Sequence, residues 1–359
     1  MRPRVCVVAP SLRILGGQAI QADRLMRHLR HEGRVEVGFV PHNPKLPAPL
    51  DRLQRIKFVR TLVTTAAYLA LLLWRVPRYD VLHVFSASYW SYALGPMLAI
   101  LVGRLYGKQV ILNYRSGDLE DHIREWPLTA ARTMALAHCI TPTPYLTGVY
   151  AKFGVKADVI PNYLDLEQRR YRERTPLRPV FLLNRLFEGL YDYPTALEAF
   201  RLIQAEVPEA RLLIAGYGPL REQILAWIAE KGLRNVDFRG KVTPAEMNEL
   251  YHEADIYMTT PLRDCFPSSI LDAFASGAPV VTTNAGGIRH IVEHDRTGWM
   301  VECGDARGLA EGALRILRDP DYGRRLAAAG RREVESRYVW DAVGPQWEAT
   351  YERLTPHRA

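Results

Sequence analysis

Residues 260–287 read TPLRDCFPSSILDAFASGAPVVTTNAGG and join a loop, a helix and a strand in one short stretch. The loop holds Asp264, and the pattern predicts a helix that begins near Pro267–Ser269. Backbone N–H groups at the start of such a helix favour phosphate and sugar hydroxyls, and Asp272, about one turn further on, is placed to accept from ribose hydroxyls. The alternative is an acidic first turn that stabilises any helix. The spacing alone leaves both interpretations open.

Apolar runs of strand length alternate with helix-length segments on both sides of this stretch. The runs are continuous in Val, Ile and Leu, which is typical of strands covered on both faces in a parallel sheet. Strands separated by helical patterns indicate βαβ units. The expected strands are Val5–Pro10, Val35–Pro41, Val81–Phe85, Gln109–Tyr114 and Ala137–Thr141 in a first domain, and Val180–Leu183, Arg211–Ala215, Val236–Arg239, Ile256–Thr259, Pro279–Thr283 and Gly298–Val301 in a second.

The length of 359 residues suits two doubly wound domains. Between the two sets of strands, Glu167–Pro179 carries five arginines, two prolines and little apolar content, which indicates an interdomain linker. We therefore expect a first domain over residues 1–167, a linker over 168–179, a second domain over 180–338 and a final helix over 339–359.

The charge and the cysteine content indicate which partners and which cellular compartment suit this chain. The formal charge of +8 suits an anionic partner such as a nucleotide diphosphate, an anionic membrane surface or nucleic acid, although many soluble proteins are this basic without a specific reason. Four scattered cysteines fit neither a disulfide framework nor a zinc site. The apolar run Val5–Pro10 is too short for a signal-peptide core. We expect a cytoplasmic protein.

The segment Leu62–Trp74 is apolar and flanked by arginines and a lysine. It is short of the roughly 20 residues that span a bilayer. One interpretation is a core-packed helix that leads to the strand Val81–Phe85. The other is a helix that rests on an anionic membrane, which would make the protein peripheral on the inner face of the membrane.

Two glycine-containing loops follow predicted strands. Gly16-Gly17 precede a helical pattern over Ala19–Arg30, where glycines would let the backbone approach a phosphate, but a double glycine is as often a mere turn. Gly216-Tyr217-Gly218 follow Arg211–Ala215 but lack the third glycine and the later acid of a dinucleotide fingerprint. A hydride-transfer enzyme is therefore disfavoured.

Taken together, Val180–Val301 resembles the nucleotide-binding domain of the family 4 glycosyltransferases. The signature of that family is Glu, seven residues, Glu, then Ala-x-Ala-x-Gly-x-Pro-Val-Val. Here Asp264, seven residues and Asp272 precede Ala-Phe-Ala-Ser-Gly-Ala-Pro-Val-Val, and Gly286-Gly287-Ile288 continues the match. The resemblance implies an α/β GT-B fold, in which two Rossmann-like doubly wound domains face each other across a cleft. It also implies a retaining, metal-independent hexosyltransferase without a cofactor, whose donor is a nucleotide-diphosphate sugar.

The resemblance also implies roles for single residues. Arg185 would pair with the donor diphosphate, Asp264 would lie near the reacting face of the sugar, and Asp272 would hold the ribose. Gly16 and Gly17 would face the diphosphate. The other expected donor-binding residues are Gly216, Tyr217, Lys241, Val242, Phe266, Pro267, Ser268 and Ser269.

This sequence departs from the family at the site. Both signature acids are Asp where Glu is usual, and Pro267 stands where a small residue is common. The phosphate-binding lysine is missing, with Leu190 or Tyr191 in its region, and Lys241 or Arg263 is a candidate replacement. Arg115 stands where the family has a histidine near the donor sugar. His122 is a candidate substitute, and its alternative is a surface or capping histidine.

In the family the last segment returns to the first domain, so we expect Trp340, Trp347 and Tyr351 to pack there. We expect a sugar or a lipid-linked molecule as acceptor, with a role in polysaccharide or glycolipid synthesis. One alternative is a catalytically impaired nucleotide-sugar-binding protein on the same fold. Another is a different GT-B enzyme, such as an epimerase or a phosphorylase. Nothing resembles a nucleic-acid recognition helix, and no nucleic acid is expected.

Overall fold

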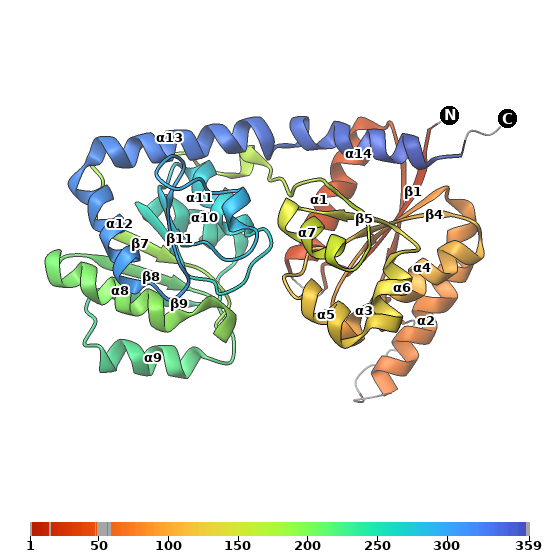
Figure 1. Cartoon of the computed structure of the whole chain (residues 1–359), viewed down its shortest axis with the longest axis horizontal. Helices are drawn as coiled ribbons and strands as arrows, with labels where there is room; N and C mark the ends of the chain where they lie inside the picture. The colour runs from red at the N-terminus through yellow and green to blue at the C-terminus, as the bar shows by residue number, and fades with distance from the viewer. Residues whose placement is uncertain (1, 14–15, 47, 49–55, 57–58, 357–359) are drawn as a thin grey trace. The chain divides into compact units, whose positions relative to one another are not determined.

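The structure is a computed structural model of the chain and describes residues 2–13, 16–46, 48, 56 and 59–356. The chain divides into two compact units, each built on a six-stranded parallel sheet (Figure 1). The first unit comprises Met1–Asn162 and Asp341–Ala359, and the second comprises Tyr163–Trp340. The contacts of residues 163–167 thus group them with the second unit.

The sheet of the first unit has the strand order β2-β1-β3-β4-β5-β6. Val5–Ala9 and the whole of β3 are buried, as continuous apolar strands covered on both faces should be. The edge strand β6 was not expected, because it has only three residues, two of them exposed. The strands are β1 (Arg4–Ala9), β2 (Glu36–Pro41), β3 (Val81–Phe85), β4 (Gln109–Asn113), β5 (His138–Thr141) and β6 (Ala157–Val159).

The helices of the first unit lie between these strands in the chain. They are α1 (Gly17–Glu32), α2 (Val59–Arg75), α3 (Tyr89–Leu94), α4 (Pro96–Leu105), α5 (Leu119–Glu125), α6 (Arg132–Met134) and α7 (Pro144–Lys152), with the short turns η2 (Val76–Arg78) and η3 (Pro127–Ala131). The last helix, α14 (Trp340–Leu354), belongs to this unit from Asp341 onward. Trp347 and Tyr351 pack on His83 of β3, whereas Trp340 packs on Tyr163 of the second unit. The packing of Trp340 on the first domain stays a prediction.

Most of helix α2 lies outside the buried core. Only Tyr68 and Leu72 of its residues are buried, so the interpretation of Leu62–Trp74 as core-packed fails for most of the helix. Together with η2, Val59–Arg78 is long and apolar enough to cross a membrane by length and composition, and 17% of its most apolar stretch is buried.

The sheet of the second unit has the order β12-β11-β10-β7-β8-β9, the doubly wound order of dinucleotide-binding folds. Its strands are β7 (Val180–Leu183), β8 (Arg211–Ala215), β9 (Val236–Gly240), β10 (Ile256–Thr259), β11 (Val280–Thr283) and β12 (Trp299–Val301). Its helices are α8 (Tyr193–Glu206), α9 (Arg221–Glu230), α10 (Pro244–Glu253), α11 (Ser268–Ser276), α12 (Ala306–Arg318) and α13 (Pro320–Arg337), with the short turns η4 (Leu166–Gln168), η5 (Gly189–Tyr191) and η6 (Ile288–His290).

Local sequence explains where several of these helices begin. Thr243 and Glu246 form a reciprocal capping box at α10, with Pro244 in the first turn. The carboxylates of Asp192, Asp305 and Asp319 accept backbone N–H groups at the starts of α8, α12 and α13. These caps hold the helices against a core that includes Phe181, Phe200 and Leu212.

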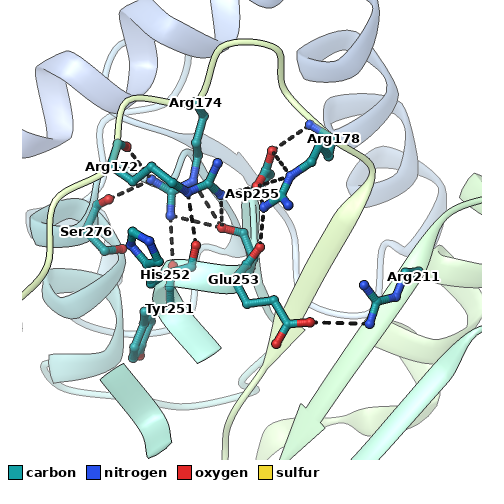
Figure 2. A network of polar contacts seen from close by, with 10 residues as sticks. Arg172, Arg174, Arg178, Arg211, Tyr251, His252, Glu253, Asp255 and Ser276 are labelled. Carbon is teal, nitrogen blue, oxygen red and sulfur yellow. Dashed lines mark hydrogen bonds and ion pairs between the residues drawn. The ribbon is translucent and has the colours of Figure 1, made fainter. Parts of the chain in front are cut away.

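The arginine-rich segment that was expected to be a linker is fixed on the second unit (Figure 2). Arg174 is 4% exposed and donates to the carbonyls of Tyr251, Ala254 and Ser276, at the carboxyl ends of α10 and α11. Arg172 and Arg178 both pair with Asp255, which is fully buried. Carbonyl groups at a helix end lack partners within the helix and favour cations, so the arginines satisfy both helix ends and the buried carboxylate.

Candidate active site

The candidate site lies where the strand order of the second unit reverses. The sheet runs outward in both directions from the adjacent strands β7 and β10, and ligands of such folds bind outside the carboxyl ends of the strands at this point. Arg185 follows β7 after one intervening residue, Asn184, and Asp264 lies in the loop between β10 and α11. The topology therefore brings together two residues that the sequence places in different motifs.

Arg185 is held by three neighbours. Its guanidinium forms an ion pair with Asp264, donates to Ser269 Oγ at 2.8 Å and lies 4.3 Å from the ring centroid of Tyr191. Burial alone would lower the pKa of Arg185, but the Asp264 carboxylate and Tyr191 outweigh burial and raise it. The side chains of Arg185 and Asp264 are 14% and 12% exposed, so this is a largely desolvated cation at the switch point.

Arg185 lines a cavity of about 200 Å³. Gly216 is required there, because a Cβ at this position would collide with the carbonyl oxygen of Arg185. The loop is further tied by hydrogen bonds from Phe187 N to Tyr217 O at 2.9 Å and from Gly216 N to Gly240 O at 2.8 Å. The other lining residues are Asn184, Leu186, Tyr191, Tyr217, Val242 and Met247.

The region of the missing lysine is occupied by an aromatic ring. Tyr191 stands there and supports Arg185 from one side. Lys241 is exposed, and its Nζ lies 5.2 Å from the ring centroid of Tyr217, beside the cavity. Lys241, one of the two proposed replacements, thus contacts a residue that lines the cavity.

Asp272 is not brought to this cavity. Its carboxylate accepts from Arg169 Nε at 2.7 Å, and the two side chains are 18% and 15% exposed. Arg169 comes from the segment expected to be a linker, and sequence reasoning gave it no role. Because the two residues lie 103 positions apart, no local pattern could have found the pair.

The backbone N–H of Phe266 does not point to an open site. It donates to Asp264 Oδ1 at 3.1 Å, and the Phe266 side chain is 6% exposed and packs on Tyr338. This N–H is thus engaged within the loop, and donor binding by Phe266 stays a prediction. Pro267 caps α11, which begins at Ser268, so Ser269 lies in the first turn, where its hydroxyl meets Arg185.

The remaining candidates, Gly16, Gly17, Arg115 and His122, belong to the first unit. Gly16 and Gly17 begin α1, are exposed, and would place an added Cβ in open space. Arg115 follows β4, donates from Nε to Asn113 Oδ1 at 2.9 Å, and lies 5.3 Å from the ring centroid of Phe85. Asn113 in turn contacts the buried His83, which the sequence did not single out.

His122 is a core residue. It is fully buried, its Nδ1 lies 3.3 Å from Tyr114 Oη, and the rings of Tyr89, Tyr92 and Trp126 surround it. Burial lowers its pKa to about 4. The interpretation of His122 as a surface or capping histidine is therefore wrong.

Comparison with known proteins finds relatives of the part of the chain that contains Arg185 and Asp264. Residues 168–333 match the family described as glycosyl transferases group 1. The chain is 30% identical over 155 residues to N-acetyl-alpha-D-glucosaminyl L-malate synthase of Bacillus anthracis, which is 43% of this chain and 40% of that protein. It is 28% identical over 207 residues to the phosphatidyl-myo-inositol mannosyltransferase of Mycobacterium leprae, 56% of this chain and 54% of that protein. The matched stretches thus span about half the length of these relatives.

Solved structures agree over nearly the whole chain. The Anabaena protein HepE, crystallised with UDP and glucose, has a TM-score of 0.75 at 15% identity and covers 98% of this chain and 99% of its own. Sucrose-phosphate synthase from Thermosynechococcus elongatus has a TM-score of 0.77 at 19% identity, with the same coverage. Residues 168–333 of this chain thus match the glycosyl transferases group 1 family, and the chain has the GT-B fold.

Proposed function

We propose that this chain is a retaining glycosyltransferase that moves a sugar from a nucleotide-diphosphate sugar to an acceptor hydroxyl, without a metal. One observation carries the proposal: Arg185, a largely buried cation, lines a cavity at the switch point of a group 1 domain. A preorganised cation at such a point is suited to the charge that develops on a departing diphosphate. HepE, which shares the fold, was crystallised with UDP-glucose.

In the proposed reaction the bond between the anomeric carbon and the diphosphate breaks, and the acceptor oxygen forms its bond on the same face. The proton of the acceptor hydroxyl passes to the departing phosphate oxygen. The enzyme then has two tasks, to position the reactants and to stabilise the leaving charge. We assign the second task to Arg185, whose guanidinium has five N–H donors. Ser269 and Asp264 each accept from one of its nitrogens, and an incoming diphosphate competes with Asp264 for the cation.

Arg115, Gly16 and Gly17 keep their proposed roles at the donor sugar and the diphosphate, and Asp272 keeps its proposed role at the ribose. Because Asp272 is paired with Arg169, ribose binding requires that the carboxylate share its oxygens or exchange Arg169 for the ribose hydroxyls. A sugar or lipid-linked acceptor remains part of the proposal.

The experiment is a panel of UDP-, GDP- and ADP-sugars screened by thermal shift, followed by measurement of nucleoside diphosphate release with and without added sugar acceptors. We expect one family of nucleotide sugars to raise the melting temperature. We also expect release of nucleoside diphosphate that depends on the acceptor and that persists in EDTA, which removes metal ions. Binding without turnover would favour the impaired binding protein. Turnover that needs inorganic phosphate would favour a phosphorylase. If no nucleotide shifts the melting temperature, the transferase proposal fails.

We also propose that the first unit docks on an anionic membrane through the outward face of α2. Between Arg60 and Arg75 the helix carries no charge, and Leu62 and Trp74 are 73% and 58% exposed. A helix without a polar outward face is normally covered. The remaining exposed residues of α2 within this stretch are Thr61, Ala66, Ala70 and Leu73.

The surroundings of this face suit a charged lipid surface. Leu101 and Leu105 of the adjacent α4 are 43% and 73% exposed. The guanidinium carbons of Arg75 and Arg78 lie 5.4 and 4.7 Å from the ring centroid of Trp74. Tryptophan next to cations is typical of the membrane–water interface.

Liposome flotation tests the membrane proposal. We expect flotation with vesicles of mixed phosphatidylcholine and phosphatidylglycerol, less with phosphatidylcholine alone, and loss in a Leu62→Ser, Trp74→Ser variant. Tyr171→Ser, at a residue of the second unit that is 52% exposed, is the matched control and should float like the wild type. Flotation that ignores lipid charge, or that survives the double substitution, would refute this docking face.

A further inference from the structure

A chain of buried polar contacts joins the last helix to Arg115. Tyr351 Oη of α14 lies 2.7 Å from His83 Nδ1, His83 Nε2 lies 2.8 Å from Asn113 Nδ2, and Asn113 Oδ1 accepts from Arg115 Nε at 2.9 Å. Tyr351, His83 and Asn113 are fully buried. A buried polar group is costly unless it is paired, so a chain of this kind specifies one arrangement of its members.

The direction of every hydrogen bond in this chain follows from the arginine. A guanidinium only donates, so the Asn113 atom that faces Arg115 must be the carbonyl oxygen. The Asn113 amide nitrogen, which also only donates, therefore faces His83, and His83 Nε2 must accept. A neutral imidazole then carries its proton on Nδ1 and donates it to Tyr351 Oη.

A stack of rings runs alongside this chain. The ring centroid of His83 lies 4.6 Å from that of Trp347 and 4.9 Å from that of Phe85, and the His83 ring is nearly parallel to the Phe85 ring. Arg115 lies over Phe85 at 5.3 Å. Asn113 and Phe85, which both contact Arg115, thus also contact His83, and His83 contacts Tyr351 and Trp347 of α14.

We propose that His83 and Asn113 are positioning residues that aim the guanidinium of Arg115, and that α14 fixes them through Tyr351 and Trp347. The proposal rests on the proposed function in so far as Arg115 takes part in the transfer. It assigns a role to the buried polar residues of β3 and β4 and to the last helix of the chain.

The chain holds only while His83 is neutral. A second ring proton would set an N–H on Nε2 against the N–H groups of Asn113, two donors facing each other. Burial, and secondarily the charge of Arg115, lower the pKa of His83 well below its ordinary value. The neutral ring with its proton on Nδ1 is therefore the form that the surroundings select.

Two variants of Asn113 separate positioning from mere packing. Asn113→Leu keeps the approximate volume but removes the acceptor of the Arg115 Nε–H and the donor to His83 Nε2. Asn113→Asp keeps an acceptor for Arg115 but has no donor for His83, so the ring should move its proton to Nε2 and accept from Tyr351 on Nδ1. Tyr92→Phe is the control, since it removes another buried hydroxyl that bonds Thr133 outside this chain.

Nitrogen-15 NMR of the imidazole and guanidinium groups tests the proposal without any assay of activity, because it shows which ring nitrogen carries the His83 proton and how fast the Arg115 Nε–H exchanges. We expect the His83 proton on Nδ1 in the wild type and in Tyr92→Phe, and on Nε2 in Asn113→Asp. We expect a slowly exchanging Arg115 Nε–H in all three, and fast exchange in Asn113→Leu. A wild-type proton on Nε2, or an Arg115 signal that Asn113→Leu leaves unchanged, would overturn the proposal.

A double-mutant cycle on turnover then tests the effect on transfer. We expect Asn113→Leu to lower kcat about as much as Arg115→Ala, with a smaller change in KM, and the double variant to be no worse than Arg115→Ala alone. Asn113→Asp should restore most of kcat. Additive losses would show that Asn113 acts independently of Arg115 and would refute the positioning role. If no nucleotide sugar is turned over, the transferase proposal fails, and the NMR result still decides the arrangement of His83, Asn113 and Arg115.

Discussion

Arg185 and Asp264 form an ion pair that joins the loop after β7 to the loop after β10. The same carboxylate accepts the backbone N–H of Phe266 through its other oxygen. Asp264 therefore fixes both the cation and the start of α11 relative to each other. A ligand that binds Arg185 meets a cation already held in place, which lowers the entropy that binding costs.

Asp264→Asn should separate binding from turnover. The amide keeps the size of the side chain but no longer competes as an anion for Arg185, so nucleoside diphosphate should bind as tightly as in the wild type or more tightly. Turnover should fall by about tenfold or more, because the sugar loses a charged partner, worth about 1.5–3 kcal/mol. Calorimetric titration and steady-state kinetics measure the two effects. Turnover equal to that of the wild type would contradict a role for Asp264 in the transfer.

The proposed ribose contact of Asp272 can be tested with a changed ligand. The wild type should bind the preferred nucleoside diphosphate about tenfold or more tightly than its 2′,3′-dideoxy analogue, since hydrogen bonds to a charged group are worth about 1.5–3 kcal/mol. Asp272→Ala should bind both alike. The paired variant Arg169→Ala, Asp272→Ala removes both members of the ion pair and controls for an unpaired arginine. If Asp272→Ala still binds the ribose form more tightly than the dideoxy analogue, another residue contacts the ribose hydroxyls.

Much of this site was predictable, and the remainder had no local signal. The strands Val180–Leu183 and Ile256–Thr259 agree with the sequence because both are uninterrupted buried apolar runs. The partners of the acids were not predictable, since the contact of Asp272 with Arg169 depends on how a distant segment folds back. The sequence indicated only that His83 belongs to an apolar strand, because a single histidine in such a run gives no sign of which residues it contacts.

Arg174 should be a major source of stability for the second unit. Burial lowers its pKa to about 9, so the side chain is still charged at neutral pH, where backbone carbonyls surround it. Arg174→Ala leaves these carbonyls unpaired and should reduce the free energy of unfolding by about 3–5 kcal/mol. Arg170→Ala, which breaks a pair with Glu249 whose side chains are 59% and 63% exposed, should cost less than about 1 kcal/mol. Urea titration followed by circular dichroism compares the two, and equal midpoints would contradict the prediction.

Acid should destabilise the first unit partly through His122. Its pKa is lowered to about 4 in the folded chain, against an ordinary value of 6.5, so the unfolded chain binds the additional proton between these values. The free energy of unfolding therefore falls as the pH drops from about 7 to 4, by about 3 kcal/mol from this group. His122→Phe should lessen the fall in melting temperature between pH 7.5 and 5, whereas His31→Gln, at an exposed position of α1, should not. An identical pH profile for wild type and His122→Phe would contradict this assignment.

The most direct test of the account is the affinity for a nucleoside diphosphate, compared with that for the corresponding nucleoside, when Arg185 is removed. Because Arg185→Ala leaves Asp264 unpaired, the variant Arg185→Ala, Asp264→Ala is measured as well, with Arg221→Ala, exposed beside Phe238, as control. Calorimetry with UDP, GDP and ADP should show a loss of about 2–5 kcal/mol in diphosphate affinity for both Arg185 variants, about 30-fold or more. Nucleoside binding and the control should remain unchanged. Diphosphate affinity that survives the loss of Arg185 would contradict the central claim.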